Sequence, residues 1–135
     1  MPGLRFYSPE LPVEQKSIIA KELTEAVARS LNLQESGRNW TIVQFMPFKL
    51  ENVALGGRLM NLDAANPFYY LEILDSGWNR EKKETLVREL TPLLAKLLNL
   101  EPAQLYKLSI LFQEYNPEDM ARAGRFLSEM GTPVS

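Results

Sequence analysis

One segment of the chain occurs twice, as EQKSIIAKELTEAVARSLNL at residues 14–33 and as EKKETLVRELTPLLAKLLNL at residues 81–100. The two copies are separated by a constant offset of 67 positions, and nine of their residues are identical. In both copies Ile or Leu recurs at three- and four-residue spacing, which predicts an amphipathic helix. Pro12 lies near the start of the first helix, and Asn79 is a suitable cap for the second.

Short apolar segments on either side of each helix predict strands. They lie at residues 4–7 and 40–45 around the first helix, and at residues 69–74 and 107–112 around the second. A strand, a crossover helix and a parallel strand form one right-handed βαβ unit. The sequence therefore predicts an α+β fold, in which two tandem β-α-β units form a four-stranded mixed sheet with two helices on one face.

The two units form pseudo-repeats, about residues 2–66 and 67–135, of a single domain that spans residues 1–135. Residues 61–67 are predicted to be a short polar connector inside that domain. Gly57 and Gly124 also obey the offset, and Gly56 beside Gly57 is typical of a tight turn. The sheet face without helices needs a cover, for which another copy of the chain is the simplest candidate.

The composition argues against several classes of function. The 135 residues carry a net charge of −2, which gives no electrostatic basis for binding nucleic acid or an anionic membrane. The chain has no cysteine and no histidine, so disulfides and thiolate nucleophiles are excluded and no metal site is expected. No signal peptide and no membrane-spanning segment is predicted, so a cytoplasmic location is expected.

Proline directly follows the first methionine. Removal of Met1 would leave Pro2 as a free secondary amine, and α-amino groups titrate at about pH 8 in model peptides. Burial or a nearby cation lowers the pKa of such an amine, because each disfavours its charged form. A neutral amine can take a proton as a general base and return it as an acid. Pro2 is therefore the predicted catalytic residue, whereas a retained Met1 would leave it an amide without a basic lone pair.

Pro2, the duplicated βαβ unit and the sequence NVALGG at residues 52–57 together resemble the tautomerase superfamily. The resemblance covers nearly the whole chain and is closest to the fused, long-subunit branch, which includes cis-3-chloroacrylic acid dehalogenase and malonate semialdehyde decarboxylase. The sequence GRFL at residues 124–127 is similar to the dehalogenase group. The resemblance implies a tautomerase/MIF-like fold, a homotrimer, catalysis by Pro2 without a cofactor, and small 2-keto, enol or unsaturated carboxylate substrates.

The chain departs from these relatives at the accessory catalytic positions. The dehalogenase group has a histidine in its first helix, two arginines that hold the substrate carboxylate, and a tyrosine and a glutamate that activate water. The decarboxylase has an acidic residue ahead of the second strand. Here Val27 matches the histidine, and Asp75 and Trp78 match the two arginines. Leu111 and Arg122 match the tyrosine and the glutamate, and Gly37 matches the acidic residue of the decarboxylase. The known routes to dehalogenation and decarboxylation are therefore disfavoured.

A carboxylate substrate requires a cation, and Arg122 is the first choice because it aligns with a functional position near the proline. An arginine there could hold a carboxylate by two hydrogen bonds, although a solvated or interface arginine is an equally good interpretation. Trp78 is predicted to shape a pocket wall, Tyr69 to reach a neighbouring subunit, and Trp40 to pack in the core or an interface. The weaker alternatives for the cation are Arg5, Arg38, Arg58 and Arg125.

These observations favour an enzyme in which Pro2 moves a proton on a small enol or 2-keto carboxylate, that is, a tautomerase or isomerase. One alternative is a hydratase or decarboxylase that uses the same proline. Another is a catalytically silent trimeric binding protein, for which the missing arginines and the missing water-activating pair argue. Neither nucleic acid nor a membrane is expected as a partner.

Overall fold

The computed structural model describes residues 1–62 and 68–130, so most of the predicted connector and residues 131–135 lie outside the described residues. Four strands form the main sheet in the order β2-β1-β5-β6. They are β1 (Gly3–Pro9), β2 (Ile42–Phe48), β5 (Tyr69–Asp75) and β6 (Leu108–Glu114). The β1–β2 and β5–β6 pairs are parallel, whereas β1 and β5 are antiparallel.

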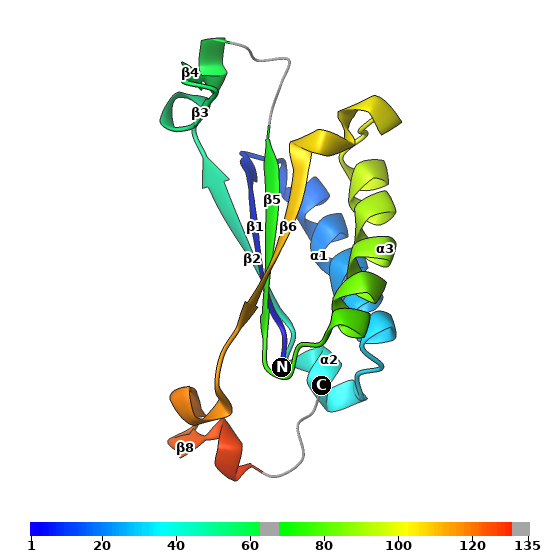
Figure 1. Ribbon diagram of the computed structural model, residues 1–135, viewed down its shortest axis with the longest axis vertical. Helices are drawn as coiled ribbons and strands as arrows, with labels where there is room; N and C mark the ends of the chain where they lie inside the picture. The colour runs from blue at the N-terminus through cyan, green and yellow to red at the C-terminus, as the bar shows by residue number, and fades with distance from the viewer. Residues whose placement is uncertain (63–67, 131–135) are drawn as a thin grey trace.

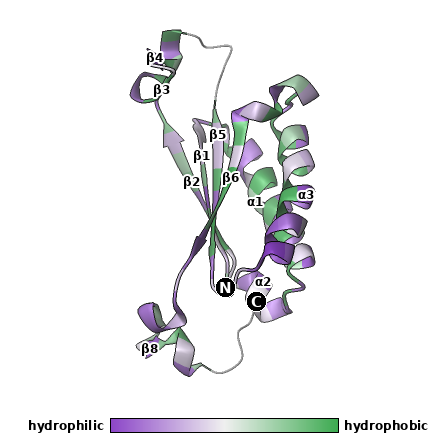
Figure 2. Ribbon diagram, viewed as in Figure 1, coloured by the Kyte–Doolittle hydropathy of each residue, from purple (hydrophilic) through white to green (hydrophobic). Residues whose placement is uncertain are grey.

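Helices α1 (Val13–Ser30) and α3 (Arg80–Leu97) lie side by side on one face of this sheet (Figure 1). The predicted α+β fold of two tandem βαβ units is therefore confirmed. The core lies between the helices and the sheet, and Figure 2 shows apolar residues on the sides of both helices that face the sheet. Its fully buried members include Leu4, Phe6, Ile19, Leu23, Leu71, Ile73, Leu86, Leu90 and Leu94. Burying each of these side chains contributes about 1.5–3 kcal/mol.

The helix ends follow the repeat. Asn79 caps α3, because its side chain accepts a hydrogen bond from the Lys82 backbone N–H at 2.8 Å, and Pro12 is the residue before α1. Asn32 and Asn99 come just after α1 and α3 and have φ values of 53° and 58°. Asparagine tolerates this left-handed conformation better than most residues, which explains why both copies keep it.

Two small hairpins extend the pattern beyond the sheet. One joins β3 (Ala54–Leu55) to β4 (Arg58–Leu59), and the other joins β7 (Ala121–Arg122) to β8 (Arg125–Phe126). Gly56 and Gly57 form the first turn with φ values of 61° and 81°, as predicted. Figure 1 shows the hairpins at opposite ends of the sheet, with the second at the same end as the N-terminus.

The remaining elements are short. They are α2 (Glu35–Asn39) and five 3-10 turns, η1 (Leu50–Asn52), η2 (Met60–Leu62), η3 (Pro102–Lys107), η4 (Pro117–Asp119) and η5 (Leu127–Glu129). Helix α2 leads into β2 and lies near the N-terminus in Figure 1. No helix among the described residues is long and apolar enough to span a membrane.

The second face of the sheet carries no helix and mixes polar with apolar side chains. Arg5 points to this face, as expected from its place between buried Leu4 and Phe6, and donates to Glu72 at 3.1 Å. Tyr7 and Tyr70 pack edge to face there, with ring centroids 5.4 Å apart. On the outer strands of the sheet Ile42, Met46 and Leu111 are exposed.

Candidate functional site

The amino terminus lies in a polar cluster at one end of the sheet. The Met1 ammonium is 3.0 Å from Asp75 Oδ1, and the Met1 and Asp75 side chains are only 9% and 4% exposed. The same oxygen accepts a hydrogen bond from the Ser76 backbone N–H at 2.8 Å. Because Gly3 pairs with Leu74 in the antiparallel β1–β5 ladder, the next pair outward places Pro2 opposite Asp75. Pro2 itself is buried.

Tyr115 follows strand β6 and adds a second polar group. Its hydroxyl donates to the Met1 carbonyl at 3.4 Å, and its backbone N–H donates to the Asp75 carbonyl at 3.1 Å. Burial raises the pKa of Tyr115, and the Asp75 charge adds to the increase, while a hydrogen bond to Ser76 and the Arg122 charge oppose it. The phenol therefore stays protonated at neutral pH and acts as a neutral hydrogen-bond donor beside the terminus.

Arg122 reaches the same place from strand β7 of the second hairpin. Its Nη1 donates to the Met1 thioether sulfur, and its guanidinium carbon lies 4.9 Å from the centroid of the Trp40 ring. Trp40 is 54% exposed, so the prediction that it packs in the core of the chain is wrong. Its ring instead supports the guanidinium by a cation–π contact.

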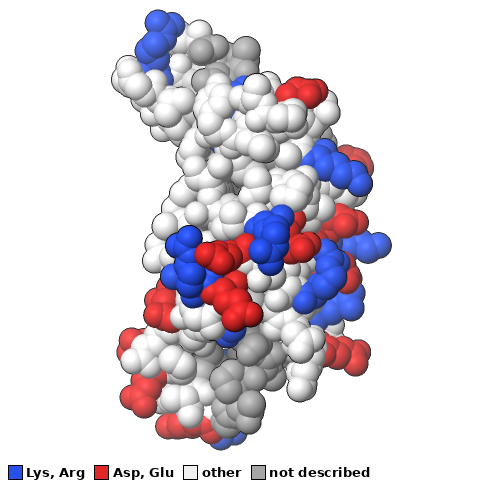
Figure 3. Space-filling model, turned by 45° about the vertical axis from the view of Figure 1, so that its right-hand side comes forward, with Lys and Arg blue, Asp and Glu red and all other residues white. Residues whose placement is uncertain are grey.

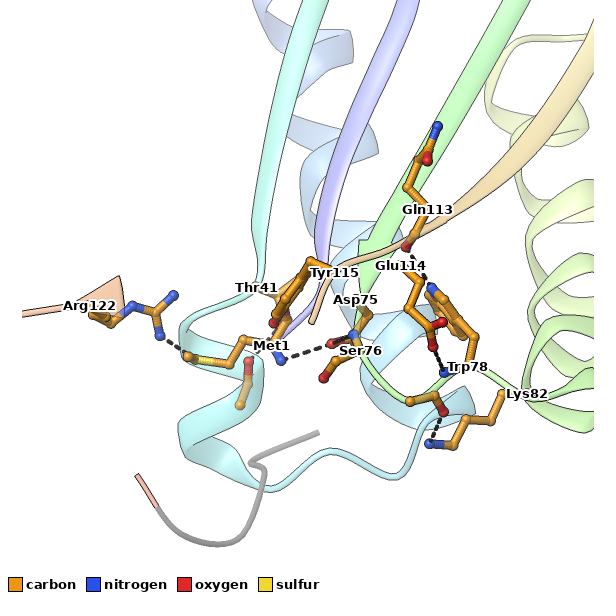
Figure 4. Close-up of polar contacts among 12 residues, drawn as sticks. Met1, Thr41, Asp75, Ser76, Trp78, Lys82, Gln113, Glu114, Tyr115 and Arg122 are labelled. Carbon is orange, nitrogen blue, oxygen red and sulfur yellow. Dashed lines mark hydrogen bonds and ion pairs between the residues drawn. The ribbon is translucent and has the colours of Figure 1, made fainter. Parts of the chain in front are cut away.

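We call Pro2, Trp40, Asp75, Tyr115 and Arg122 the N-terminal cluster. Figure 4 shows Asp75, Tyr115 and Arg122 around Met1, which they approach from the ends of different elements. Around the Met1 ammonium, which is the chain-terminal nitrogen, the cluster brings together a carboxylate, a neutral donor and a cation. That set is suited to moving a proton on a small anion and contains no thiol or imidazole. Among the described residues, no group of three or more acidic side chains is arranged to hold a metal ion.

Trp78 lies near this cluster but faces another way. Its indole N–H donates to the Gln113 carbonyl at 2.8 Å, its backbone N–H donates to Glu114, and its ring meets Phe112 at 5.1 Å. Figure 4 shows Trp78 on the far side of Ser76 from Met1 and Arg122. These contacts tie the start of α3 to β6, and they do not place the indole against Pro2.

Tyr69 is at the opposite end of the sheet from Pro2. Strand β5 runs antiparallel to β1, so Asp75 at its last position is beside the terminus while Tyr69 at its first is not. Its ring stacks on Phe6 at 6.3 Å, and burial raises its pKa. The structure therefore does not bring Tyr69 to Pro2 of the same chain, and a role for it in a neighbouring subunit's site stays a prediction.

The structure separates Arg122 from the alternative arginines. Arg5 is paired with Glu72 on the open sheet face, and Arg38 is paired with Glu25. Arg125 donates to the Glu129 carbonyl at 3.1 Å. Arg58 belongs to the hairpin at the other end of the molecule. Of the five candidates, Arg122 is the one with a contact to Met1.

A separate hollow of about 310 Å³ lies along the outer side of α3, against Phe112. Basic and acidic side chains line it together, including Arg80, Lys83, Glu84 and Arg88. Figure 3 likewise shows positive and negative side chains interspersed on the face it displays. The hollow shares no residue with the N-terminal cluster.

Tyr115 was not predicted from the sequence as a candidate site residue, and Asp75 was noted there only as a substitution. The predicted mixed sheet could have placed both residues near the amino terminus. If the two βαβ units meet through antiparallel first strands, the carboxyl ends of the second unit's strands lie beside the start of the first. Asp75 and Tyr115 stand at those carboxyl ends.

No protein-family model and no curated protein matches the chain. Solved structures do match it over nearly its whole length. A fused 4-OT, described as a wild-type asymmetric trimer, superimposes with a TM-score of 0.76 at 20% identity, covering 96% of this chain and 99% of that one. A member of the cis-3-chloroacrylic acid dehalogenase family gives 0.75 at 21% identity, covering 96% and 85%. The chain has the tautomerase-superfamily fold.

A third structure with the tautomerase-superfamily fold is of a protein inactivated by 2-oxo-3-pentynoate. It gives a TM-score of 0.80 at 14% identity, covering 96% of this chain and 99% of that one. Identities this low establish the shared fold and not a shared reaction, because one fold supports many chemistries. The recognition of the tautomerase-superfamily fold from Pro2, the repeat and residues 52–57 is confirmed, and any activity has to be argued from the N-terminal cluster.

Proposed function

We propose that the protein is an amino-terminal-proline tautomerase, which moves a proton between carbon and oxygen of a small enol or 2-keto carboxylate. The observation that carries this proposal is the contact of Asp75, Tyr115 and Arg122 with Met1, the residue whose removal exposes the Pro2 amine. Pro2 would transfer the proton to and from carbon. Tyr115 would donate a hydrogen bond to the substrate oxygen, and Arg122 would hold the carboxylate.

Charge supports an anionic substrate. Without Met1, the cluster comprises the Pro2 amine, the Asp75 carboxylate and the Arg122 guanidinium. With Pro2 protonated these groups sum to one positive charge, which attracts a monocarboxylate. Met1 also marks where a ligand of similar size would lie, because its thioether contacts Arg122 while its backbone adjoins Pro2. The exposed Trp40 ring beside Arg122 would form an apolar wall of the same site.

A homotrimer is part of the proposal. The sheet face without helices exposes Ile42, Met46 and Leu111, and apolar residues on a sheet face are normally covered by another layer. The hairpins also expose apolar side chains, among them Leu55 and Phe126. The fused 4-OT with the same fold is a trimer. Three copies of this chain packed through their open sheet faces would remove these side chains from water.

The test combines the mass of the intact protein with a kinetic assay. Loss of Met1, together with ketonisation of phenylenolpyruvate that collapses in Pro2→Ala, supports the proposal. A retained Met1 or an activity that Pro2→Ala leaves unchanged refutes it. A retained Met1 together with no ketonisation would favour a silent protein with this fold, in which Met1 permanently fills the site.

A further inference from the structure

Asp75 is a buried carboxylate that faces the amino terminus. Its side chain is 4% exposed, it lies 3.0 Å from the Met1 ammonium, and it accepts the Ser76 N–H at 2.8 Å. A charge removed from water in this way is costly unless an opposite charge stays beside it. While Met1 is present, its ammonium is that charge. Removal of Met1 therefore creates a demand for a new cation at the same place.

The Pro2 nitrogen is positioned to meet that demand. It is three covalent bonds from the Met1 nitrogen, which limits the distance between the two atoms to about 4 Å. Pro2 also stands opposite Asp75 in the continued β1–β5 register. We propose, on the basis of the proposed function, that Asp75 pairs with the Pro2 ammonium once Met1 is removed and keeps it charged, so that Pro2 starts the reaction as a proton donor to carbon.

The other ionisable groups around the terminus do not cancel this pairing. Arg122, from β7, opposes it, but its contact is with the Met1 sulfur rather than with the nitrogen. Tyr115, from the end of β6, is a neutral donor. Glu114 and Lys82, the next charges along, are bound to the Trp78 N–H and the Gly77 carbonyl. A buried opposite charge close to the amine outweighs a more distant like charge, since the interaction weakens with distance and with exposure to water.

The resulting step conserves atoms and charge. In ketonisation of an enol, the N–H bond of the Pro2 ammonium breaks as a C–H bond forms on the substrate. The enol O–H proton passes to water, and the Pro2 amine then regains a proton from water. The enol has become its keto isomer, and the ammonium–carboxylate pair is restored. Asp75 acts through Pro2 in this scheme and is a positioning residue.

The experiment reads the protonation of Pro2 directly. Protein labelled with ¹⁵N-proline is treated with a methionine aminopeptidase, and its mass confirms that Met1 is gone. Of the nine prolines, all except Pro2 are tertiary amides, so one nitrogen signal titrates. The signal is followed from pH 5 to 11 in the wild type, in Asp75→Asn and in Glu118→Gln, where Glu118 is an exposed carboxylate of η4 that serves as the charge-matched control.

We expect the midpoint in Asp75→Asn to fall by about one pH unit or more, because an opposite charge is lost from beside the ammonium. Glu118→Gln should titrate like the wild type. If Asp75→Asn does not fold, Asp75→Ser keeps an acceptor for the Ser76 N–H and should show the same fall. Equal midpoints in the Asp75 variant and the Glu118 control would overturn the inference.

The same preparations separate this inference from the proposed function. The inference fails alone if the midpoints are equal while Pro2→Ala still abolishes ketonisation. The proposed function fails alone if the midpoint falls in Asp75→Asn while the wild type does not ketonise phenylenolpyruvate. If both hold, the fall of kcat/KM at alkaline pH should move to lower pH in Asp75→Asn by as much as the nitrogen midpoint does.

Discussion

Replacing Arg122 with alanine is the sharpest test of how the site would hold its substrate. Arg122 is half-buried, contacts Met1 and rests on the Trp40 ring, so truncation removes one cation and leaves the neighbouring backbone in place. A hydrogen bond to a charged group contributes about 1.5–3 kcal/mol. At about 1.4 kcal/mol for each factor of ten, kcat/KM for phenylenolpyruvate should fall by about 10- to 150-fold. Most of the loss should appear as a higher KM, because the carboxylate is bound equally in the ground state and the transition state.

The matched control is Arg125→Ala, which removes a cation from the partner strand of the same hairpin. It should retain kcat/KM within about twofold of the wild type. The methyl ester of the same enol provides a second comparison. The wild type should turn it over poorly, and Arg122→Ala should lose little further activity on it, because the ester has no carboxylate charge to lose. Equal losses on acid and ester, or equal losses in Arg122→Ala and Arg125→Ala, would refute the assignment of Arg122 to the carboxylate.

Three further predictions concern the fold. The stability of Tyr115→Phe should depend less on alkaline pH than that of the wild type. Burial raises the pKa of Tyr115 in the folded chain, so the unfolded chain loses the phenolic proton first. The free energy of unfolding of the wild type therefore falls as pH rises above about 10. Urea unfolding at pH 9 and 11 measures the difference, and an identical decline in both proteins would contradict it. Asn79→Ala should cost about 1 kcal/mol through loss of the α3 cap, seen as a lower Tm, whereas an unchanged Tm would show that the cap contributes nothing. Leu111→Asp, on the uncovered sheet face, should reduce the oligomer to smaller species in sedimentation velocity, and an intact trimer would show that this face is not the interface.

The fold could be predicted because its determinants are local and are repeated. The helices and the strands each have a signal in the sequence, and the duplication makes these signals appear twice, whereas the Asn79 cap of α3 has no counterpart at Pro12. The observed strands start and end within about three residues of the predicted ones, for example Ile42–Phe48 against residues 40–45. The pairing of the two strands within each unit followed from the rule that βαβ crossovers are right-handed and short, whereas the order β2-β1-β5-β6 comes from the structure.

The candidate site was harder to predict because its contacts join residues far apart in the chain. Pro2 and Arg122 were predicted, yet the support that Trp40 gives Arg122 depends on how α2 and the second hairpin approach each other. Trp40 was expected to pack in the core or an interface; it is not in the core, since its ring is exposed and the Arg122 cation lies over it, and an interface role stays a prediction. Tyr115 has no local signal, since a tyrosine after a strand is ordinary until the sheet order places it beside the amino terminus.

The two halves of the chain have the same backbone plan and different chemistry at equivalent places. Asp75 stands opposite Pro2 in the continued register, as Ser8 stands opposite Tyr69 at the other end of the sheet. At the offset of 67, the positions equivalent to Pro2, Asp75, Tyr115 and Arg122 hold Tyr69, Ser8, Phe48 and Leu55. Only the first half can present a free amine, at Pro2. The end of the sheet that holds Pro2 is therefore the end that needs a carboxylate and a cation.

That asymmetry yields a strict kinetic prediction. Ser8→Ala and Leu55→Ala alter the equivalents of Asp75 and Arg122 at the end without an amine. They should leave kcat/KM for phenylenolpyruvate within about twofold of the wild type, whereas Arg122→Ala lowers it by at least about tenfold. The Tm of each variant shows whether it is folded. Among the hydrogen bonds described for its side chain, Ser8 donates only to the Pro9 carbonyl. A folded Ser8→Ala protein with a tenfold loss of kcat/KM would therefore mean that the end of the sheet that holds Tyr69 also takes part in the reaction. The reasoning that confines the chemistry to the Pro2 end would then be wrong.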